Sequence, residues 1–257
     1  MMVDRERVIQ SFNDYASGYD SSDEKIRLKI VHTFKVASLC EKISRSISLD
    51  DDDCDLAWFI GMMHDIGRFE QVRRFSSFFD TGLVDHAEFG ADLLFGDGLL
   101  AWFADECDPV VEVAIRMHNK LKVGQGLSAR EAMFCNIVRD ADKIDILRVN
   151  VDSPASEIYN CTPEAVREAS ISPEVEEVFY QHRCVPRELR RTEADLVVSH
   201  GCLCYELVYP FSTEEVLRQG FVFQLLSFPT DNPETARKLK AMNAHMRDYL
   251  EMAVAHA

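Results

Sequence analysis

The sequence predicts an all-α protein. Apolar residues recur at the spacing of helix faces along most of its 257 residues, and no segment alternates apolar and polar residues as a half-buried strand does. Apolar residues make up 47% of the chain and charged residues 28%, a composition typical of ordinary globular proteins and not of disordered or fibrous ones. Without internal repeats or a clear linker, we expect one domain over residues 1–257, with a core at 25–150 and a helical completion at 150–257.

The N-terminal segment predicts a short helix followed by a long one. Residues 1–24 are polar, with scattered apolar positions before a Ser-Gly-Tyr-Asp-Ser-Ser-Asp break. From Lys25 to Ser46 an apolar stripe contains His32, and Ser22 or Asp23 can cap this helix. The imidazole of His32 is therefore expected to face the core, where a lone histidine is usually satisfied by a carbonyl or a hydroxyl group.

A buried helix is predicted from Cys54 to Met63, after an acidic run at residues 50–53 that we expect to be a solvated loop. It carries His64 and Asp65 at its C-terminal end, and Gly67 permits the chain to turn away. Burying a histidine and an aspartate is costly unless a cation or a hydrogen-bonding partner meets them.

The segment after Gly67 is rich in arginine and phenylalanine. In so acidic a protein, Arg68, Arg73 and Arg74 could serve an anionic group of a substrate. They could equally belong to a surface loop in which the arginines pair with carboxylates.

Three further helices complete the predicted core. Asp85 is a plausible cap for a helix that has His86 in its first turn, and Pro109 opens a helix that ends near His118. The next helix runs from Ser128 or Ala129 to Val149, with acids at three positions, Asp140, Asp142 and Asp145. Helical phase does not choose among these acids.

The C-terminal part is also predicted to be helical. Residues 150–199 are punctuated by prolines, with short helical patches at 164–170 and 174–180, and residues 200–228 are strongly apolar. A final amphipathic helix is expected from about Asp231 through Met252.

Charge and composition exclude several classes of function. A net charge of −16 would repel a polyanion, so bulk binding of nucleic acid is not expected. No stretch approaches the roughly 20 apolar residues of a membrane span, and the N-terminus lacks the apolar core of a signal peptide, so we expect a cytoplasmic protein without a membrane partner. The 8 cysteines lack paired zinc-finger spacing and are expected to be buried, reduced thiols.

Metal-ligand residue types recur beside the apolar helices of the core. The candidate ligands are His32, His64, Asp65, His86, His118 and one acid of the last core helix. Imidazole nitrogens and carboxylate oxygens without thiolate suit Fe, Mn or similar divalent ions, or Zn and Mg with water, better than a structural zinc site.

The order His, His-Asp, Asp over residues 25–150 resembles the HD-domain metal-dependent phosphohydrolase superfamily. The string Ala141-Asp142-Lys143-Ile144-Asp145 looks like the final motif of that family and favours Asp142 among the three acids. His86 and His118 fall where binuclear members place two extra histidines. Residues 64–68 are similar to the HDIGK segment of cyclic-dinucleotide phosphodiesterases, with Arg68 in place of lysine and no GYP motif near His118.

The resemblance implies an HD-domain helical bundle with a C-terminal helical extension and two divalent metal ions at its centre. Fe or Mn is expected, with Zn, Mg or Ni as alternatives. One ion would be held by His32, His64 and Asp142 and the other by His86 and His118, with Asp65 bridging.

The implied reaction is hydrolysis of a phosphoester or phosphoanhydride of a small, nucleotide-like anion by a metal-activated water. Arg68 and Lys143 would be cations beside the phosphate, although Lys143 could equally support the ligand carboxylates. Arg73 and Arg74 are further candidates for substrate binding. The alternatives are a mixed-valent di-iron oxygenase on the same scaffold and a helical protein that keeps the metal without catalysis.

Overall fold

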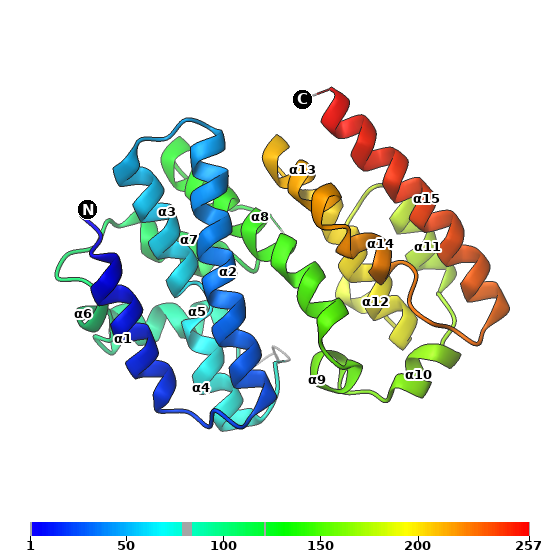
Figure 1. Ribbon diagram of the computed structural model, residues 1–257, viewed down its shortest axis with the longest axis horizontal. Helices are drawn as coiled ribbons and strands as arrows, with labels where there is room; N and C mark the ends of the chain where they lie inside the picture. Colours follow the sequence, from blue (N-terminus) through cyan, green and yellow to red (C-terminus); the bar gives the residue numbers. More distant parts are fainter. Residues whose placement is uncertain (1, 79–83, 121, 257) are drawn as a thin grey trace. The chain divides into compact units, whose positions relative to one another are not determined.

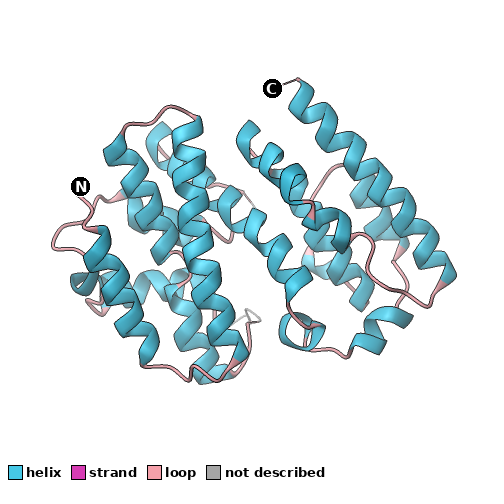
Figure 2. Cartoon of the chain, in the orientation of Figure 1, coloured by secondary structure: helices cyan, strands magenta, loops and turns pink. Residues whose placement is uncertain are grey.

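The computed structural model describes residues 2–78, 84–120 and 122–256. Helices are the regular elements of these residues and no strand occurs among them, so the prediction of an all-α protein is confirmed (Figure 2). The chain divides into two compact units, Met1–Asp142 and Lys143–Ala257, and the division falls inside one long helix. The single domain expected over residues 1–257 stays a prediction, and each unit is described by itself.

The first unit is built around two adjacent helices, α2 and α3 (Figure 1). A Cβ on Gly61 of α3 would lie 2.6 Å from the Cα of Ala37 on α2, so the two backbones approach closely. The helices of this unit are α1 (Arg5–Ser17), α2 (Glu24–Ser46), α3 (Asp51–Met63), α4 (Ile66–Phe75), α5 (His86–Ala91), a π-helical turn (Asp92–Gly96), α6 (Leu100–Phe103), α7 (Val110–Met117) and the first part of α8 (Ala129–Asp152).

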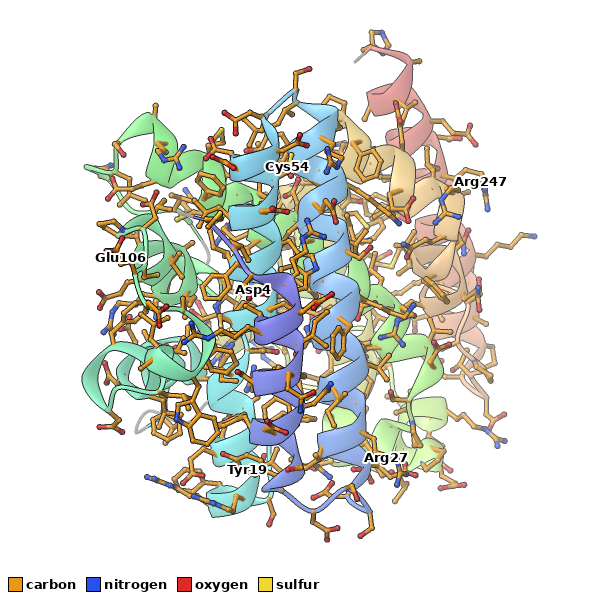
Figure 3. The ribbon with its side chains drawn as sticks, turned by 60° about the vertical axis from the view of Figure 1, so that its left-hand side comes forward. Asp4, Tyr19, Arg27, Cys54, Glu106 and Arg247 are labelled. Carbon is orange, nitrogen blue, oxygen red and sulfur yellow. The ribbon has the colours of Figure 1, made fainter. Side chains whose placement is uncertain are left out.

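The N-terminal helix α1 covers one side of this unit. Asp4 caps it by accepting a hydrogen bond from the Arg7 backbone N–H at 3.0 Å, and Tyr19 follows shortly after its end (Figure 3). The buried ring of Phe12 packs edge-on against the rings of Phe34 and Phe69, at centroid distances of 5.4 and 5.7 Å. An aromatic cluster therefore joins α1 to α2 and α4.

The acidic run before Cys54 is part of α3, so the expected solvated loop is wrong. Asp50 is the N-cap and accepts a hydrogen bond from the Asp53 backbone N–H at 2.9 Å. Asp51 and Asp52 lie with Asp53 in the first turn, where unpaired N–H groups and the helix dipole favour negative charge. The run begins the helix that His64 directly follows.

Gly67 lies within α4 and does not end a helix, contrary to the turn that the sequence favoured. A Cβ at this position would lie 2.7 Å from the carbonyl oxygen of His86 and 2.7 Å from the backbone nitrogen of Gly90. The glycine is therefore required because α4 and α5 approach each other at backbone distance. This approach places the helix that begins at His86 beside Asp65.

The second unit is also helical. Its helices after α8 are α9 (Ala155–Tyr159), α10 (Pro163–Glu168), α11 (Pro173–Tyr180), α12 (Glu193–Gly201), α13 (Pro210–Gln219), α14 (Phe221–Leu225) and α15 (Pro233–Ala255), with 3₁₀ turns at Arg187–Leu189 and Cys202–Glu206. Asn232 caps α15 through its side chain, close to the start that the sequence predicts. Lys238 on α15 is buried and pairs with Glu176 of α11 at 2.9 Å, which joins these two helices.

All 8 cysteines are free thiols, and none contributes to a group that could hold a metal in the described part of the chain. Among the described residues, no helix has both the length and the apolar character of a membrane span.

Candidate metal centre

The histidines that the sequence nominates converge inside the first unit. His32 lies in the middle of α2, His64 and His118 directly follow α3 and α7, and His86 is the first residue of α5. Each has an exposed fraction of 4% or less. Four buried imidazoles from four helices therefore lie in one interior region.

One group of side chains comprises His32, His64 and Asp142. The Nε2 atoms of the two histidines are 3.3 Å apart. Oδ1 of Asp142 lies 3.1 Å from Nε2 of His32 and 3.8 Å from Nε2 of His64. These atoms can bind a single ion together.

A second group comprises Asp65, His86 and His118. The two imidazoles face each other with their Nε2 atoms 3.0 Å apart. Oδ1 of Asp65 lies 3.5 Å from Nε2 of His86 and 3.7 Å from Nε2 of His118. This group also has the spacing of a site for one ion.

Asp65 joins the two groups through its two oxygens. While Oδ1 faces His86 and His118, Oδ2 lies 3.5 Å from Nε2 of both His32 and His64. The carboxylate is 2% exposed. A bridging position between two cations is the role that the sequence resemblance implied for this residue.

Backbone carbonyls orient two of the imidazoles. Nδ1 of His64 is 2.7 Å from the carbonyl oxygen of Gly61, and Nδ1 of His118 is 2.7 Å from that of Ile115. Each carbonyl belongs to the last turn of a helix, where carbonyl groups are available to side-chain donors. The geometry assigns the ring proton to Nδ1, which therefore donates and leaves the Nε2 lone pair directed toward the carboxylates.

The protonation states of three side chains in this cluster suit a metal. Burial lowers the pKa of His64 to about 3, because the charged imidazolium is disfavoured away from water. Burial acts to raise the pKa of Asp65, but the ammonium group of Lys29 and the imidazole of His64 outweigh it and hold that pKa well below its ordinary value. For Asp142, the hydrogen bond with His32 likewise outweighs burial and lowers the pKa. The neutral imidazole of His64 and the ionised carboxylates of Asp65 and Asp142 are the forms that bind metal ions.

Lys29 is a residue of this centre that the sequence reasoning missed. Its Nζ lies 2.5 Å from Oδ2 of Asp65, and its side chain is 12% exposed. The available signal was its position three residues before His32, which places both side chains on one face of α2.

Arg68 lies on the other side of Asp65. Its Nε is 3.6 Å from Oδ1 of Asp65, and its Nη1 donates to the side-chain oxygen of Gln71 and to the carbonyl oxygen of Phe78. The ring of Phe78 lies 5.2 Å from the Lys29 ammonium and 5.8 Å from the Arg68 guanidinium. Two cations therefore adjoin the oxygens of Asp65, and one aromatic ring lies beside both cations.

Arg73 and Arg74 have different surroundings. Both pair with Glu70 at 2.5 Å, and they lie over the rings of Tyr19 and Phe89, respectively. Both line a surface pocket of about 510 Å³ whose other residues are Asp14, Tyr15, Gly18, Tyr19, Glu70, Leu93, Asp97, Gly98, Leu99 and Trp102. No predicted metal ligand lines this pocket. The partners of Arg73 and Arg74 given above, Glu70, Tyr19 and Phe89, are not predicted metal ligands either.

The charged residues near Asp142 on α8 do not join the histidines. Asp145 forms a pair of hydrogen bonds with Arg148, at 2.7 and 2.8 Å. Lys143 donates to the carbonyl oxygen of Glu206 at 3.3 Å within the second unit. Asp140 is fully buried but does not belong to either group of potential ligands. Of the three acids that helical phase left open, Asp142 is the one beside the histidines.

The residues present fit two divalent metal ions. The two groups supply nitrogen and carboxylate oxygen and no sulfur, the donor set preferred by Fe, Mn and similar ions. Within each group the donor atoms lie within 4.8 Å of one another. The shared carboxylate of Asp65 and the carbonyl-oriented imidazoles are further features of metal centres.

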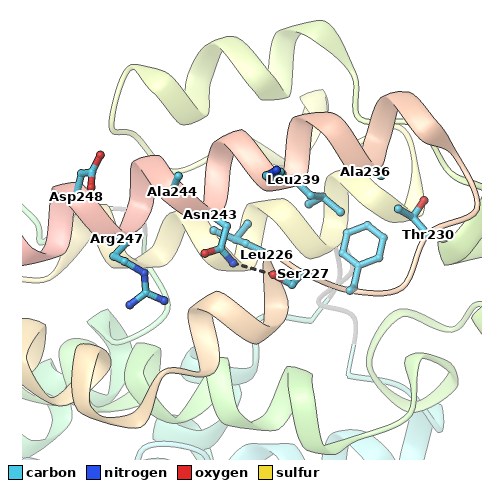
Figure 4. Close-up of a pocket in the computed structure, with 11 residues that line it drawn as sticks. Leu226, Ser227, Thr230, Ala236, Leu239, Asn243, Ala244, Arg247 and Asp248 are labelled. Carbon is cyan, nitrogen blue, oxygen red and sulfur yellow. Dashed lines mark hydrogen bonds between the residues drawn. The ribbon is translucent and has the colours of Figure 1, made fainter.

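A larger pocket, of about 630 Å³, lies elsewhere, on the surface of the second unit (Figure 4). Asn243 in its wall donates a hydrogen bond to the Ser227 hydroxyl at 2.8 Å, and the guanidinium of Arg247 lies 3.9 Å from the centre of the Phe223 ring. Its lining residues are Leu226, Ser227, Phe228, Thr230, Ala236, Leu239, Lys240, Asn243, Ala244, Arg247 and Asp248. Neither group of potential metal ligands lines this pocket, so its size alone does not make it the reactive site.

Comparison with known proteins identifies the segment that holds the centre. Residues 30–149 match the family model described as HD domain. All the predicted ligands, from His32 to Asp142, fall within this match. No curated protein and no solved structure matches the chain significantly.

Proposed function

Because residues 30–149 of this chain form an HD domain, we propose that the protein is a metal-dependent phosphohydrolase with two divalent ions, Fe or Mn in preference to Zn, Mg or Ni. Its substrate is a phosphoester or phosphoanhydride of a small, nucleotide-like anion. His32, His64 and Asp142 hold one ion, His86 and His118 hold the other, and Asp65 bridges them.

The observation that carries this proposal is the position of the Asp65 carboxylate. One oxygen faces His86 and His118, while the other faces His32 and His64, at 3.5–3.7 Å from the ring nitrogens. A carboxylate shared in this way supports two ions in one centre rather than two separate sites. Such a centre, when loaded, supplies a water of lowered pKa and neutralises charge on phosphoryl oxygens.

The remaining steps belong to residues of the chain. Lys29 and Arg68 place positive charge on either side of Asp65, where an anionic phosphoryl group would be attracted and oriented. The phenyl ring of Phe78, beside both cations, offers an apolar surface for the organic part of the substrate. Arg73 and Arg74 remain proposed substrate contacts for a longer molecule, although Glu70 offsets part of their charge. Lys143 remains a proposed phosphate-side cation or support for the ligand carboxylates.

The test is a substrate survey with reconstituted protein. Protein stripped of metal is loaded with Mn²⁺ or Fe²⁺ and incubated with phosphomonoesters, nucleotides, cyclic dinucleotides and dinucleoside polyphosphates. We expect hydrolysis of at least one class, and its loss in Asp65→Asn, which keeps the shape of the side chain but removes its charge. An enzyme inert toward every class would contradict the proposal, and oxygen consumption by the Fe-loaded protein would favour the di-iron oxygenase.

A further inference from the structure

A second pair of facing imidazoles lies in the other unit, outside the proposed metal centre. Nε2 of His182, two residues after the end of α11, lies 2.8 Å from Nε2 of His245 on α15. The two residues are 63 positions apart in the chain. Neither residue has a role in the function proposed above.

The geometry of this pair matches that of the histidines in the first unit. There the Nε2 atoms of His32 and His64 are 3.3 Å apart, and those of His86 and His118 are 3.0 Å apart. In all three pairs, the ring nitrogen farther from the backbone faces its counterpart on another element. Two imidazoles arranged in this way can each direct one lone pair at a common ion.

Aromatic side chains hold the two imidazoles in position. The ring of His182 stacks on Tyr205, with centroids 5.0 Å apart, and lies 4.7 Å from the ring of Tyr249. The ring of His245 lies 5.0 Å from that of Tyr180. His182 also has a left-handed backbone conformation, with φ of 55°, which turns its side chain back toward α15 after α11 has ended. Ligands fixed before binding lose little conformational entropy when the ion arrives.

We propose that His182 and His245 form a binding site for a single divalent transition-metal ion, such as Zn²⁺, Ni²⁺ or Cu²⁺, for which imidazole is a favourable ligand. His182 is exposed and His245 is partly exposed, so water completes the coordination. The ion links α11 to α15.

The experiment compares Zn²⁺ binding to the full-length wild type and His245→Ala by equilibrium dialysis and metal analysis. We expect the variant to bind one equivalent less than the wild type. His256→Ala, which removes an exposed histidine one residue beyond the same helix, is the matched control and should bind as much as the wild type. This difference of one equivalent is independent of the ions in the HD domain, so it does not depend on the proposed phosphohydrolase activity.

A second variant and a second measurement guard against a folding defect. His182→Asn retains a residue that tolerates the left-handed conformation and should also lose one equivalent. Zn²⁺ should raise the melting temperature of wild type and His256→Ala more than that of either variant of the pair, because the ion links two helices. Equal Zn²⁺ capacity and equal thermal shifts in all four proteins would show that the two imidazoles form a hydrogen bond only, and would overturn the proposal.

Discussion

The ammonium nitrogen of Lys29 lies 2.5 Å from Oδ2 of Asp65, and both side chains are largely shielded from water. Lys29 thus compensates the charge of the carboxylate proposed to bridge two metal ions. Removing one partner of a buried ion pair leaves the other charge without compensation, which typically costs about 3–5 kcal/mol.

We therefore expect Lys29→Met to lower the free energy of unfolding of the metal-free protein by roughly that amount. Added Mn²⁺ should recover more stability in Lys29→Met than in the wild type, because the ions then supply the positive charge beside Asp65. Urea unfolding with chelator and with Mn²⁺ measures both effects. Lys35→Met, an exposed lysine on the same helix, is the control and should change little. Equal unfolding free energies for the two variants would contradict the role of Lys29.

The two groups of ligands should be separable by mutation. Protein purified without added metal should hold two equivalents, and His86→Ala should retain about one, because His32, His64 and Asp142 remain intact. Asp65→Asn should lower both occupancies, since its oxygens face both groups. Metal analysis of the purified proteins checks these numbers. Loss of both ions in His86→Ala, with Asp65→Asn unchanged, would be inconsistent with a bridged centre.

Much of the fold could be predicted from the sequence because local signals and packing agree. The apolar stripe around His32 predicts α2, and the structure uses Asp23 as its cap. Asp85 and Asn232 cap their helices through side-chain oxygens, close to where the sequence places those starts. Helix-capping residues can be recognised in the sequence because they bind backbone N–H groups next to their own position.

Other features could not be predicted from the sequence because a residue's role depends on a distant partner. Gly67 is typical of a helix end, yet the close approach of α5 explains it. The polar character of Lys29 does not reveal that Asp65 lies across from it. Composition leaves Arg73 and Arg74 open between an anionic substrate and surface carboxylates, and their pairing with Glu70 depends on the turn of α4, which brings this carboxylate to both.

The choice between Asp140 and Asp142 can be tested directly. Both aspartates lie on α8, but only Asp142 has an oxygen beside the histidines, 3.1 Å from Nε2 of His32. Asp142→Asn should therefore lose about one equivalent of metal, whereas Asp140→Asn should keep both and be destabilised, because its carboxylate is fully buried. Metal analysis together with urea unfolding separates the two effects. Equal metal loss in both variants would speak against the assignment of Asp142.

The contact between α4 and α5 predicts a sharp difference between two glycines. In Gly67→Ala the new Cβ would lie 2.7 Å from backbone atoms of His86 and Gly90, so the helices must separate. We expect a loss of about 1–3 kcal/mol in the free energy of unfolding, as for other overpacked sites. The same shift should weaken binding of the ion that we propose His86 to hold. Gly96→Ala, where no atom lies within 4 Å of the new Cβ, is the control and should be close to neutral.

His200 makes the stability of the protein depend on pH. Burial, together with the charge of Arg190, lowers the pKa of His200 from 6.5 to about 4 in the folded state. Well above pH 6.5 the imidazole is neutral in both the folded and the unfolded state, so its titration does not change the free energy of unfolding. As the pH falls from 6.5 toward 4, the unfolded chain takes up a proton that the folded chain does not, and the folded state loses stability.

His200→Asn removes this titration and keeps a polar group near the hydroxyl of Tyr159, which lies 3.3 Å from Nδ1 of the histidine. The free energy of unfolding of the variant should therefore fall less steeply between pH 6.5 and 4 than that of the wild type, whatever its value at pH 7. Urea unfolding at several pH values in this window, with chelator present, gives the two slopes. His256→Asn, which removes an exposed histidine, should keep the wild-type slope. Identical slopes for wild type and His200→Asn would mean that His200 takes up its proton equally well in both states.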